Sequence, residues 1–206
     1  MSFGSDEYVE MFEIGGPRAV GIKFGRRGFA RVLVTQMERA VKNLYNEGVR
    51  KIAVMGVGPM GYAPRILWDG RRRLHGKNCI EEVNEVVSSY NDKLAERLLN
   101  LQSMLSGLQI VFCDIYRGMM EIISNSHTYG FSSVKNACCG VGDFGAMVGC
   151  QNLEMSCSDP SSHIWWDFYS TTEAVNSLLA NWSWSPPESR LQICQPIDLH
   201  QLLSTT

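Results

Sequence analysis

Three side chains in the last quarter of the chain are of the types that carry out ester and amide hydrolysis. His163, Asp167 and Ser170 lie close together in the sequence. An imidazole placed between a carboxylate and a hydroxyl can activate that hydroxyl as a nucleophile. The apolar run Ile164–Trp166 follows His163 directly, however, and an extended segment there separates the imidazole from Ser170. We therefore expect His163 to be a packed or surface residue, and the alternative is a base that serves Ser170.

Ser170 also begins a sequence that is typical of a helix start. Glu173 stands three residues after it, which is the spacing of a capping box. The pattern predicts a last helix over residues 170–184 with Ser170 as its cap. A serine hydroxyl cannot accept a proton near neutral pH, so Ser170 cannot itself be a general base. Since no base is evident within its range, a structural role is favoured over a nucleophilic one.

Other segments carry short motifs that are informative together rather than singly. They are Ser2–Val9, Gly56–Pro64, Cys79–Leu94, Tyr129–Phe131 with Ala137–Gly140, and Pro196–Leu203. In order and spacing, and with the block around Asp167, they resemble the conserved blocks of the plant GDSL esterase/lipases of the SGNH hydrolase superfamily. The resemblance covers about the last three-fifths of a family member, so the blocks with the serine nucleophile and the oxyanion glycine are expected upstream of Met1.

The resemblance assigns a role to three positions, and two of them hold a residue unsuited to that role. Asp167 stands at the position of the triad acid, and Ser170 stands where the family has its histidine base. Asp6 stands where the family has an asparagine that donates to the oxyanion, and an ionised carboxylate has no donor and repels that charge. The resemblance implies a hydrolase of ester bonds that acts in lipid degradation, with an acyl ester or lipid as substrate and no cofactor. Ser170 and Asp6 predict that this chain is inactive.

Two other interpretations stay open at this point. The sequence can be a fragment of a longer, secreted protein, in which Ser170 and Asp6 would still be unsuited to catalysis. It can also be a non-catalytic binding module or a module stabilised by a partner.

Apolar runs and helical periodicity alternate along the chain, which is typical of an α/β fold with a parallel sheet. Buried strands are predicted at residues 52–57 and 108–113, and helices at residues 29–47, 79–106 and 115–125, with Asn78 and Glu81 capping the second helix. The resemblance implies a flavodoxin-like three-layer α/β/α fold, the SGNH hydrolase fold, truncated at its N-terminus and forming a single domain over residues 1–206. Loss of the first strands would leave an exposed sheet edge, which predicts self-association.

Seven cysteines are many for a chain of 206 residues, and four of them lie within twenty residues. The four are Cys138, Cys139, Cys150 and Cys157. They are candidates for disulfides, with at least one pair expected within about 7 Å between Cα atoms. The alternative is a zinc site, although no C-x-x-C spacing supports it. An odd count leaves at least one thiol unpaired within a monomer. The resemblance implies that this thiol is Cys79, because Tyr62 replaces the family's partner cysteine.

Composition excludes several classes of function. A net charge of −2 gives no electrostatic reason to expect binding to nucleic acid or to an anionic membrane. The run Arg71–Arg73 is typical of a solvated surface. No apolar run reaches the length of a membrane span. The sequence Gly140–Gly145 matches G-x-G-x-x-G, but no strand precedes it, so no nucleotide cofactor is expected. The first residues contain neither the basic region nor the apolar core of a secretion signal, so the chain as written is expected to be intracellular. The resemblance, in contrast, implies a family that is mostly secreted.

Overall fold

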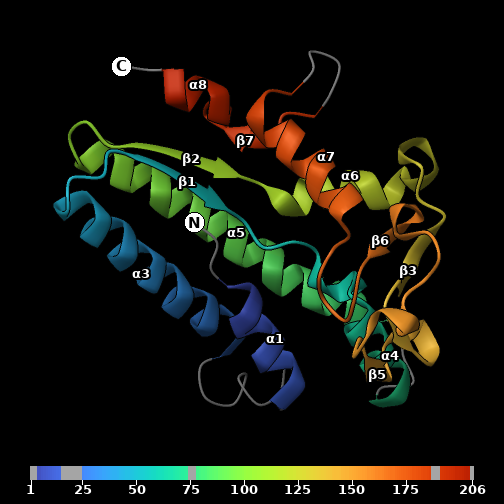
Figure 1. Cartoon of the computed structure of the whole chain (residues 1–206). Helices are drawn as coiled ribbons and strands as arrows, with labels where there is room; N and C mark the ends of the chain where they lie inside the picture. The colour runs from blue at the N-terminus through green and yellow to red at the C-terminus, as the bar shows by residue number, and fades with distance from the viewer. Residues whose placement is uncertain (1–3, 15–24, 74–77, 187–190, 205–206) are drawn as a thin grey trace. The chain divides into compact units, whose positions relative to one another are not determined.

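A computed structural model describes residues 4–14, 25–73, 78–186 and 191–204, and these form two compact units. The first unit contains Met1–Gly58, Glu85–Tyr116 and Asn181–Thr206, and the second contains Pro59–Asn84 and Arg117–Ala180. The chain thus passes between the units several times, and neither unit is one continuous segment. The helices and strands are labelled in Figure 1.

The first unit holds a three-stranded sheet in the order β1–β2–β7. Strands β1 (Lys51–Met55) and β2 (Gln109–Cys113) are parallel, with Ile52 opposite Ile110 and Val54 opposite Phe112. The short strand β7 (Cys194–Gln195) runs antiparallel to β2. The predicted pairing of two buried parallel strands is therefore confirmed. Ile52 and Val54 alternate with more exposed residues, which is the period of a strand with one face in the core.

Helices of the first unit are α1 (Ser5–Ile14), α3 (Gly25–Asn46), most of α5 (Asn78–Met104) and α8 (Leu199–Ser204). In α3 the buried side chains recur at helical spacing: Ala30, Leu33, Val34, Met37 and Val41. Helices α3 and α5 lie alongside each other (Figure 1), and the Arg97 guanidinium is 3.5 Å from the Glu38 carboxylate. The helices predicted at 29–47 and 79–106 are confirmed with small shifts of their ends. The predicted cap at Asn78 lies outside the residues whose side chains the structure describes.

A buried asparagine on α5 holds the chain where it leaves β1. The Asn91 amide nitrogen donates to the Val57 carbonyl at 2.8 Å, and its amide oxygen accepts from the Val57 N–H at 2.9 Å. Gly56 precedes this point, and a Cβ there would lie 2.9 Å from the Phe112 ring and 3.2 Å from the Asn91 side chain. The close approach of α5 and β2 to the backbone therefore requires glycine at position 56.

The second unit contains two small sheets. Strands β3 (Ser133–Ala137) and β6 (His163–Trp165) are parallel, and β4 (Gly140–Val141) and β5 (Val148–Gly149) form a short antiparallel hairpin. Helix α4 (Pro64–Arg73) belongs to this unit, α6 (Ile115–Ser124) leads into it, and α7 (Glu173–Trp184) leads out of it. Single 3-10 turns lie at Met60–Tyr62, Ser126–Tyr129, Asp143–Gly145, Leu153–Met155 and Pro160–Ser162. The Gly140–Gly145 segment is thus part of a hairpin and not a strand-to-helix turn.

The last helix begins later than the capping box predicts. Helix α7 starts at Glu173, and its first backbone bond runs from the Asn176 N–H to the Thr172 carbonyl at 3.0 Å. The preceding residues pair with the extended segment instead, because the Trp166 N–H donates to the Ser170 carbonyl and the Thr172 N–H donates to the Ile164 carbonyl. The prediction that Ser170 caps the helix is therefore wrong. Its N–H donates to the Asp167 carboxylate and its carbonyl accepts from the Trp166 N–H, so its backbone belongs to the preceding turn.

Three disulfides join six of the seven cysteines. Cys138–Cys157 and Cys139–Cys150 have Cα separations of 4.9 Å and 5.0 Å, so the prediction of at least one disulfide pair within this cluster is confirmed. With both disulfides formed, these four sulfur atoms are not thiolate ligands for zinc. Cys113–Cys194 joins directly opposed residues of β2 and β7, and the sequence did not predict this pair. The side chain of Cys79 lies outside the part of the chain that the structure describes.

Candidate active site

The loop after β6 contains two of the three residues expected to form the site. One carboxylate oxygen of Asp167 accepts from the Tyr169 N–H at 3.0 Å and from the Ser170 N–H at 2.7 Å. The Trp166 N–H donates to the Ser170 carbonyl at 2.7 Å, which closes the same turn. This is the arrangement in which an aspartate organises a local turn through its own backbone. Asp167 therefore shapes the loop, and among the described residues its carboxylate meets no histidine ring.

Ser170 is exposed at the end of this turn. Its N–H and carbonyl are hydrogen-bonded, while its hydroxyl makes no hydrogen bond to a residue that the structure describes. A hydroxyl without a neighbouring base is a weak nucleophile, and it cannot take up a proton at neutral pH. The position that the family resemblance assigns to the base thus carries no group able to act as one.

Asp6 lies in the first unit, in the first turn of α1, and it is exposed. The Gly4 carbonyl accepts the first backbone bond of this helix from the Tyr8 N–H, and the Glu7 carboxylate accepts from the Gly4 N–H at 3.0 Å. Carboxylates in a first turn are stabilised by the unpaired N–H groups and the helix dipole. Asp6 is thus a solvated residue at the start of a helix. The helix start explains both acidic residues without any catalytic role.

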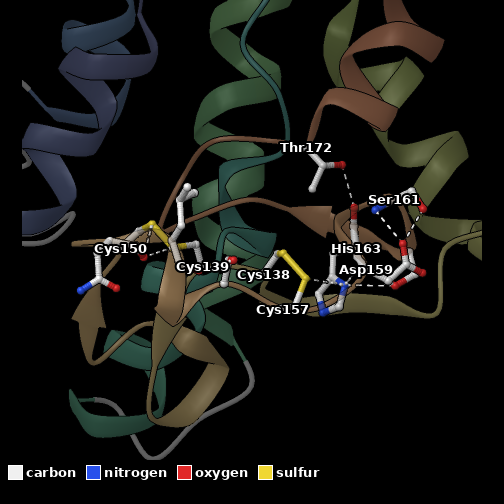
Figure 2. Close-up of a disulfide and its surroundings, with 12 residues drawn as sticks. Cys138, Cys139, Cys150, Cys157, Asp159, Ser161, His163 and Thr172 are labelled. Carbon is white, nitrogen blue, oxygen red and sulfur yellow. Dashed lines mark hydrogen bonds between the residues drawn. A yellow bond between two sulfur atoms is a disulfide. The ribbon is translucent and has the colours of Figure 1, made fainter.

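His163 is the nearest imidazole in the sequence, and its ring faces a different neighbourhood (Figure 2). The ring nitrogen Nδ1 lies 3.1 Å from the Asp159 carbonyl, 3.2 Å from the Ser162 hydroxyl and 3.6 Å from the Cys157 sulfur. Within the part of the chain that the structure describes, the ring makes no hydrogen bond to Asp167 or to Ser170.

A second set of residue types suited to hydrolysis lies around this histidine, at Asp159, Ser161, Ser162 and His163. Its connections differ from those of a triad. The Asp159 carboxylate accepts from the Ser161 hydroxyl at 2.5 Å, and this bond holds the pKa of Asp159 below its usual value. The imidazole meets the neutral carbonyl of Asp159 and not its carboxylate. Since no carboxylate of a described residue orients the ring, the set is a turn and not a nucleophile with its base.

Arg65 on α4 supports the Asp167 loop, and the sequence did not predict this role. Its N–H donates to the Phe168 carbonyl at 3.3 Å, and its guanidinium lies 5.0 Å from the centre of the Phe168 ring and 4.5 Å from that of Trp68. The guanidinium also donates to the Ala146 carbonyl at 3.0 Å. The sequence signal for Arg65 was its spacing from Asp69, which places opposite charges one helical turn apart. In the structure, Arg65 Nε lies 3.8 Å from Asp69 Oδ2.

Comparisons with known proteins agree with the motif pattern. The sequence profile of the GDSL-like Lipase/Acylhydrolase family matches residues 3–183. GDSL esterase/lipase At1g71250 of Arabidopsis thaliana is 29% identical over 97% of this chain and 52% of its own length. GDSL esterase/lipase At4g16230 of the same plant is 34% identical over 84% of this chain and 46% of its own length. GDSL esterase/lipase 7, also from Arabidopsis thaliana, is 25% identical over 98% of this chain and 54% of its own length.

The chain therefore belongs to the GDSL-like lipase/acylhydrolase family, and the resemblance read from its motifs is confirmed. It spans about half the length of the relatives that it matches. Within the described residues, no helix combines the length and the apolar character that a membrane span requires.

Proposed function

We propose that this chain carries the GDSL ester-hydrolase scaffold in a form that does not hydrolyse esters. The observation that carries the proposal is the state of the Asp167 loop. The residue at the base position is Ser170, and the Asp167 carboxylate binds the backbone of its own turn. A triad that lacks its histidine loses roughly 10⁴–10⁶-fold in turnover, because its members act as one unit. We also propose that the chain has the family's three-layer α/β/α fold. In that fold Asp6 would replace the asparagine that donates to the oxyanion, which would lower turnover by a further factor of roughly 10²–10³.

Two causes of inactivity have to be distinguished: the serine at the base position, and the lack of the serine nucleophile within residues 1–206. A chimera meets this need. It joins the N-terminal half of an active Arabidopsis GDSL esterase/lipase to residues 1–206 of this chain, and it is assayed on short-chain acyl esters of p-nitrophenol. We expect turnover no higher than that of a heat-denatured sample. The same chimera with Ser170→His and Asp6→Asn should regain activity, and the purified chain with Ser170→His alone should stay inactive.

A fluorophosphonate probe provides a control that does not depend on the ester. It labels only a serine that a base has activated, so the chimera with both substitutions should be labelled and the parent chimera should not. Turnover by the unmodified chimera that disappears with Ser170→Ala or His163→Ala would refute the proposal. Activity that fails to return in the double variant, with the far-ultraviolet circular dichroism of a folded protein, would show that other positions are also defective.

The alternative is a non-catalytic binding module, and one group of side chains favours it. Val141, Met147 and Val148 on the β4–β5 hairpin are 44%, 52% and 43% exposed, and the nearby Leu153 is 78% exposed. Such a group can bind the acyl chain of a lipid without turnover. Binding of a fluorescent fatty acid that Met147→Ser weakens, with Leu203→Ser on α8 as the exposed control, would support this alternative.

The compartment is a proposal of its own. Three disulfides are typical of proteins that fold in an oxidising environment. We therefore propose that the protein folds in an oxidising compartment, as secreted proteins do, in place of the intracellular location expected from the sequence as written. Expression in the oxidising periplasm of a bacterium should yield more folded chain than expression in its cytoplasm.

A further inference from the structure

We infer that Cys138, Cys157 and His163 form a binding site for one divalent cation of the zinc class when the disulfide between the two cysteines is reduced. The two sulfur atoms and the imidazole nitrogen all lie within 4.8 Å of one another. Within the part of the chain that the structure describes, no other group of three such side chains comes this close. Thiolate and imidazole are the ligands that zinc prefers.

The distances agree with those of a tetrahedral ion. Bonds of about 2.3 Å to sulfur and about 2.0 Å to nitrogen separate a sulfur from a nitrogen by about 3.5 Å and two sulfurs by about 3.8 Å. Cys157 Sγ and His163 Nδ1 are 3.6 Å apart, so this edge of the tetrahedron already exists. Reduction breaks the bond between the two sulfurs and lets them move apart to the remaining edge. The Cα atoms of the two cysteines, at 4.9 Å, can stay in place.

The backbone holds the three residues together without the disulfide. The Cys157 N–H donates to the Cys138 carbonyl at 2.6 Å, and the Cys138 N–H donates to the Trp165 carbonyl at 2.9 Å. His163 begins β6, which pairs with β3 just before Cys138, and its carbonyl accepts from the Thr172 hydroxyl at 2.7 Å. Figure 2 shows the imidazole beside the sulfur of Cys157 on this frame. Little reorganisation is therefore needed before an ion binds.

The histidine can change partner at low cost. As a ligand, Nδ1 gives up its contacts with the Asp159 carbonyl and the Ser162 hydroxyl. That carbonyl keeps a donor, because the Ser162 hydroxyl already donates to it at 2.9 Å. Cys157 and His163 are partly exposed while Cys138 is buried, so an ion can enter from the solvent side and a water molecule can complete four ligands.

The chemistry balances with a dithiol as the reductant. The dithiol gives two electrons and two protons to the Cys138–Cys157 bond and itself becomes a disulfide. Each new thiol then loses one proton to solvent as it binds the cation, and the two thiolate charges offset the charge of the ion. Among the residues that the structure describes, no histidine stands in the corresponding place beside the Cys139–Cys150 pair, so its reduction creates no such site there.

Cobalt(II) is the probe for this site, because thiolate ligands give it a charge-transfer band and tetrahedral geometry gives it strong visible bands. The full chain is titrated with cobalt(II) before and after reduction by a water-soluble phosphine, in a Cys139→Ser/Cys150→Ser background. We expect one bound ion per chain after reduction and none before. Cys138→Ser/Cys157→Ser should abolish binding, and His163→Ala should weaken it roughly tenfold or more. His200→Ala is the matched control, and it should have no effect.

A measurement on the unmutated chain guards against variants that fail to fold. The reduced chain is alkylated with iodoacetamide, with and without zinc, and the labelled cysteines are located by mass spectrometry. Zinc should protect Cys138 and Cys157 more than Cys139 and Cys150. Equal protection of all four, cobalt binding by the oxidised chain, or unchanged binding in His163→Ala would each overturn the inference. So would a reduced chain that unfolds and does not recover its circular dichroism when zinc is added.

Discussion

Replacing Asn91 should destabilise the first unit much more than replacing an exposed polar side chain on α5 does. The Asn91 amide makes both hydrogen bonds of the Val57 backbone, at 2.8 Å and 2.9 Å. Asn91 is 5% exposed and Val57 is 1% exposed, so water cannot easily take its place. Leaving a buried donor or acceptor unsatisfied costs about 1–3 kcal/mol for each group. Two groups together predict a loss of about 2–6 kcal/mol in the free energy of unfolding.

Two substitutions should divide this range. Asn91→Leu fills the space with an apolar side chain and keeps water out, so it should lie toward the upper end. Asn91→Ala leaves room in which a water molecule can bridge the two Val57 groups, so it should lie toward the lower end. Asn100→Ala is the matched control, because Asn100 lies on the same helix with an exposed side chain. Its effect should stay within about 0.5 kcal/mol.

Urea denaturation followed by far-ultraviolet circular dichroism measures the change in the free energy of unfolding. Hydrogen exchange of the Val57 amide gives the local readout, since that N–H should be protected in the parent and exchange faster in both Asn91 variants. If both variants match Asn100→Ala in stability, or if Val57 keeps its protection, the hydrogen bonds of Asn91 do not stabilise the exit from β1 and the reasoning is refuted.

Three other measurements test different parts of the molecule. Burial raises the pKa of Tyr8 and of Tyr90 well above the usual range, with Tyr90 contributing to the first and Glu7 to the second. Above about pH 10 only the unfolded chain then loses these protons, so the free energy of unfolding should fall by about 1.4 kcal/mol per pH unit for each tyrosine. In rapid urea titrations, Tyr8→Phe should remove the part of this slope that is due to Tyr8. Arg65→Ala should lower the free energy of unfolding by about 1–2 kcal/mol, because it removes the stacking of the guanidinium on Phe168. Arg65→Lys should be less destabilising than Arg65→Ala but still less stable than the parent. Equal stability of all three proteins in calorimetry would contradict this. The denatured, unreduced chain should react with a thiol reagent once per chain, since three disulfides use six of seven cysteines, and Cys79→Ser should abolish the reaction.

Self-association through an exposed sheet edge stays a prediction. A concentration series in analytical ultracentrifugation tests it directly. A single monomeric species at every concentration would contradict it.

Local patterns in the sequence determined much of the secondary structure. The apolar runs that became β1 and β2 are short and bounded by polar residues, and a pair of such strands with a helix between them is parallel. The periodicity of α3 and α5 likewise follows from side chains a few residues apart. Proximity in the chain also indicated that at least one pair among the four clustered cysteines lies within disulfide reach, but it did not indicate which cysteines pair. The structure pairs Cys138 with Cys157 and Cys139 with Cys150, at sequence separations of 19 and 11.

Tertiary structure decided what depends on residues far apart in the chain. Cys113 and Cys194 are 81 residues apart, and only the antiparallel pairing of β7 with β2 brings them together. The sequence around Ser170 favoured a helix cap, but Thr171 and Thr172 pair with β6 instead, and the helix begins only at Glu173. The motifs alone assigned Asp167 to the family's acid position. The structure shows that its carboxylate binds the backbone of its own turn. The pairing of β3 with β6 places His163 beside the Cys138–Cys157 disulfide, and Cys138 is a neighbour that the local sequence around His163 does not contain.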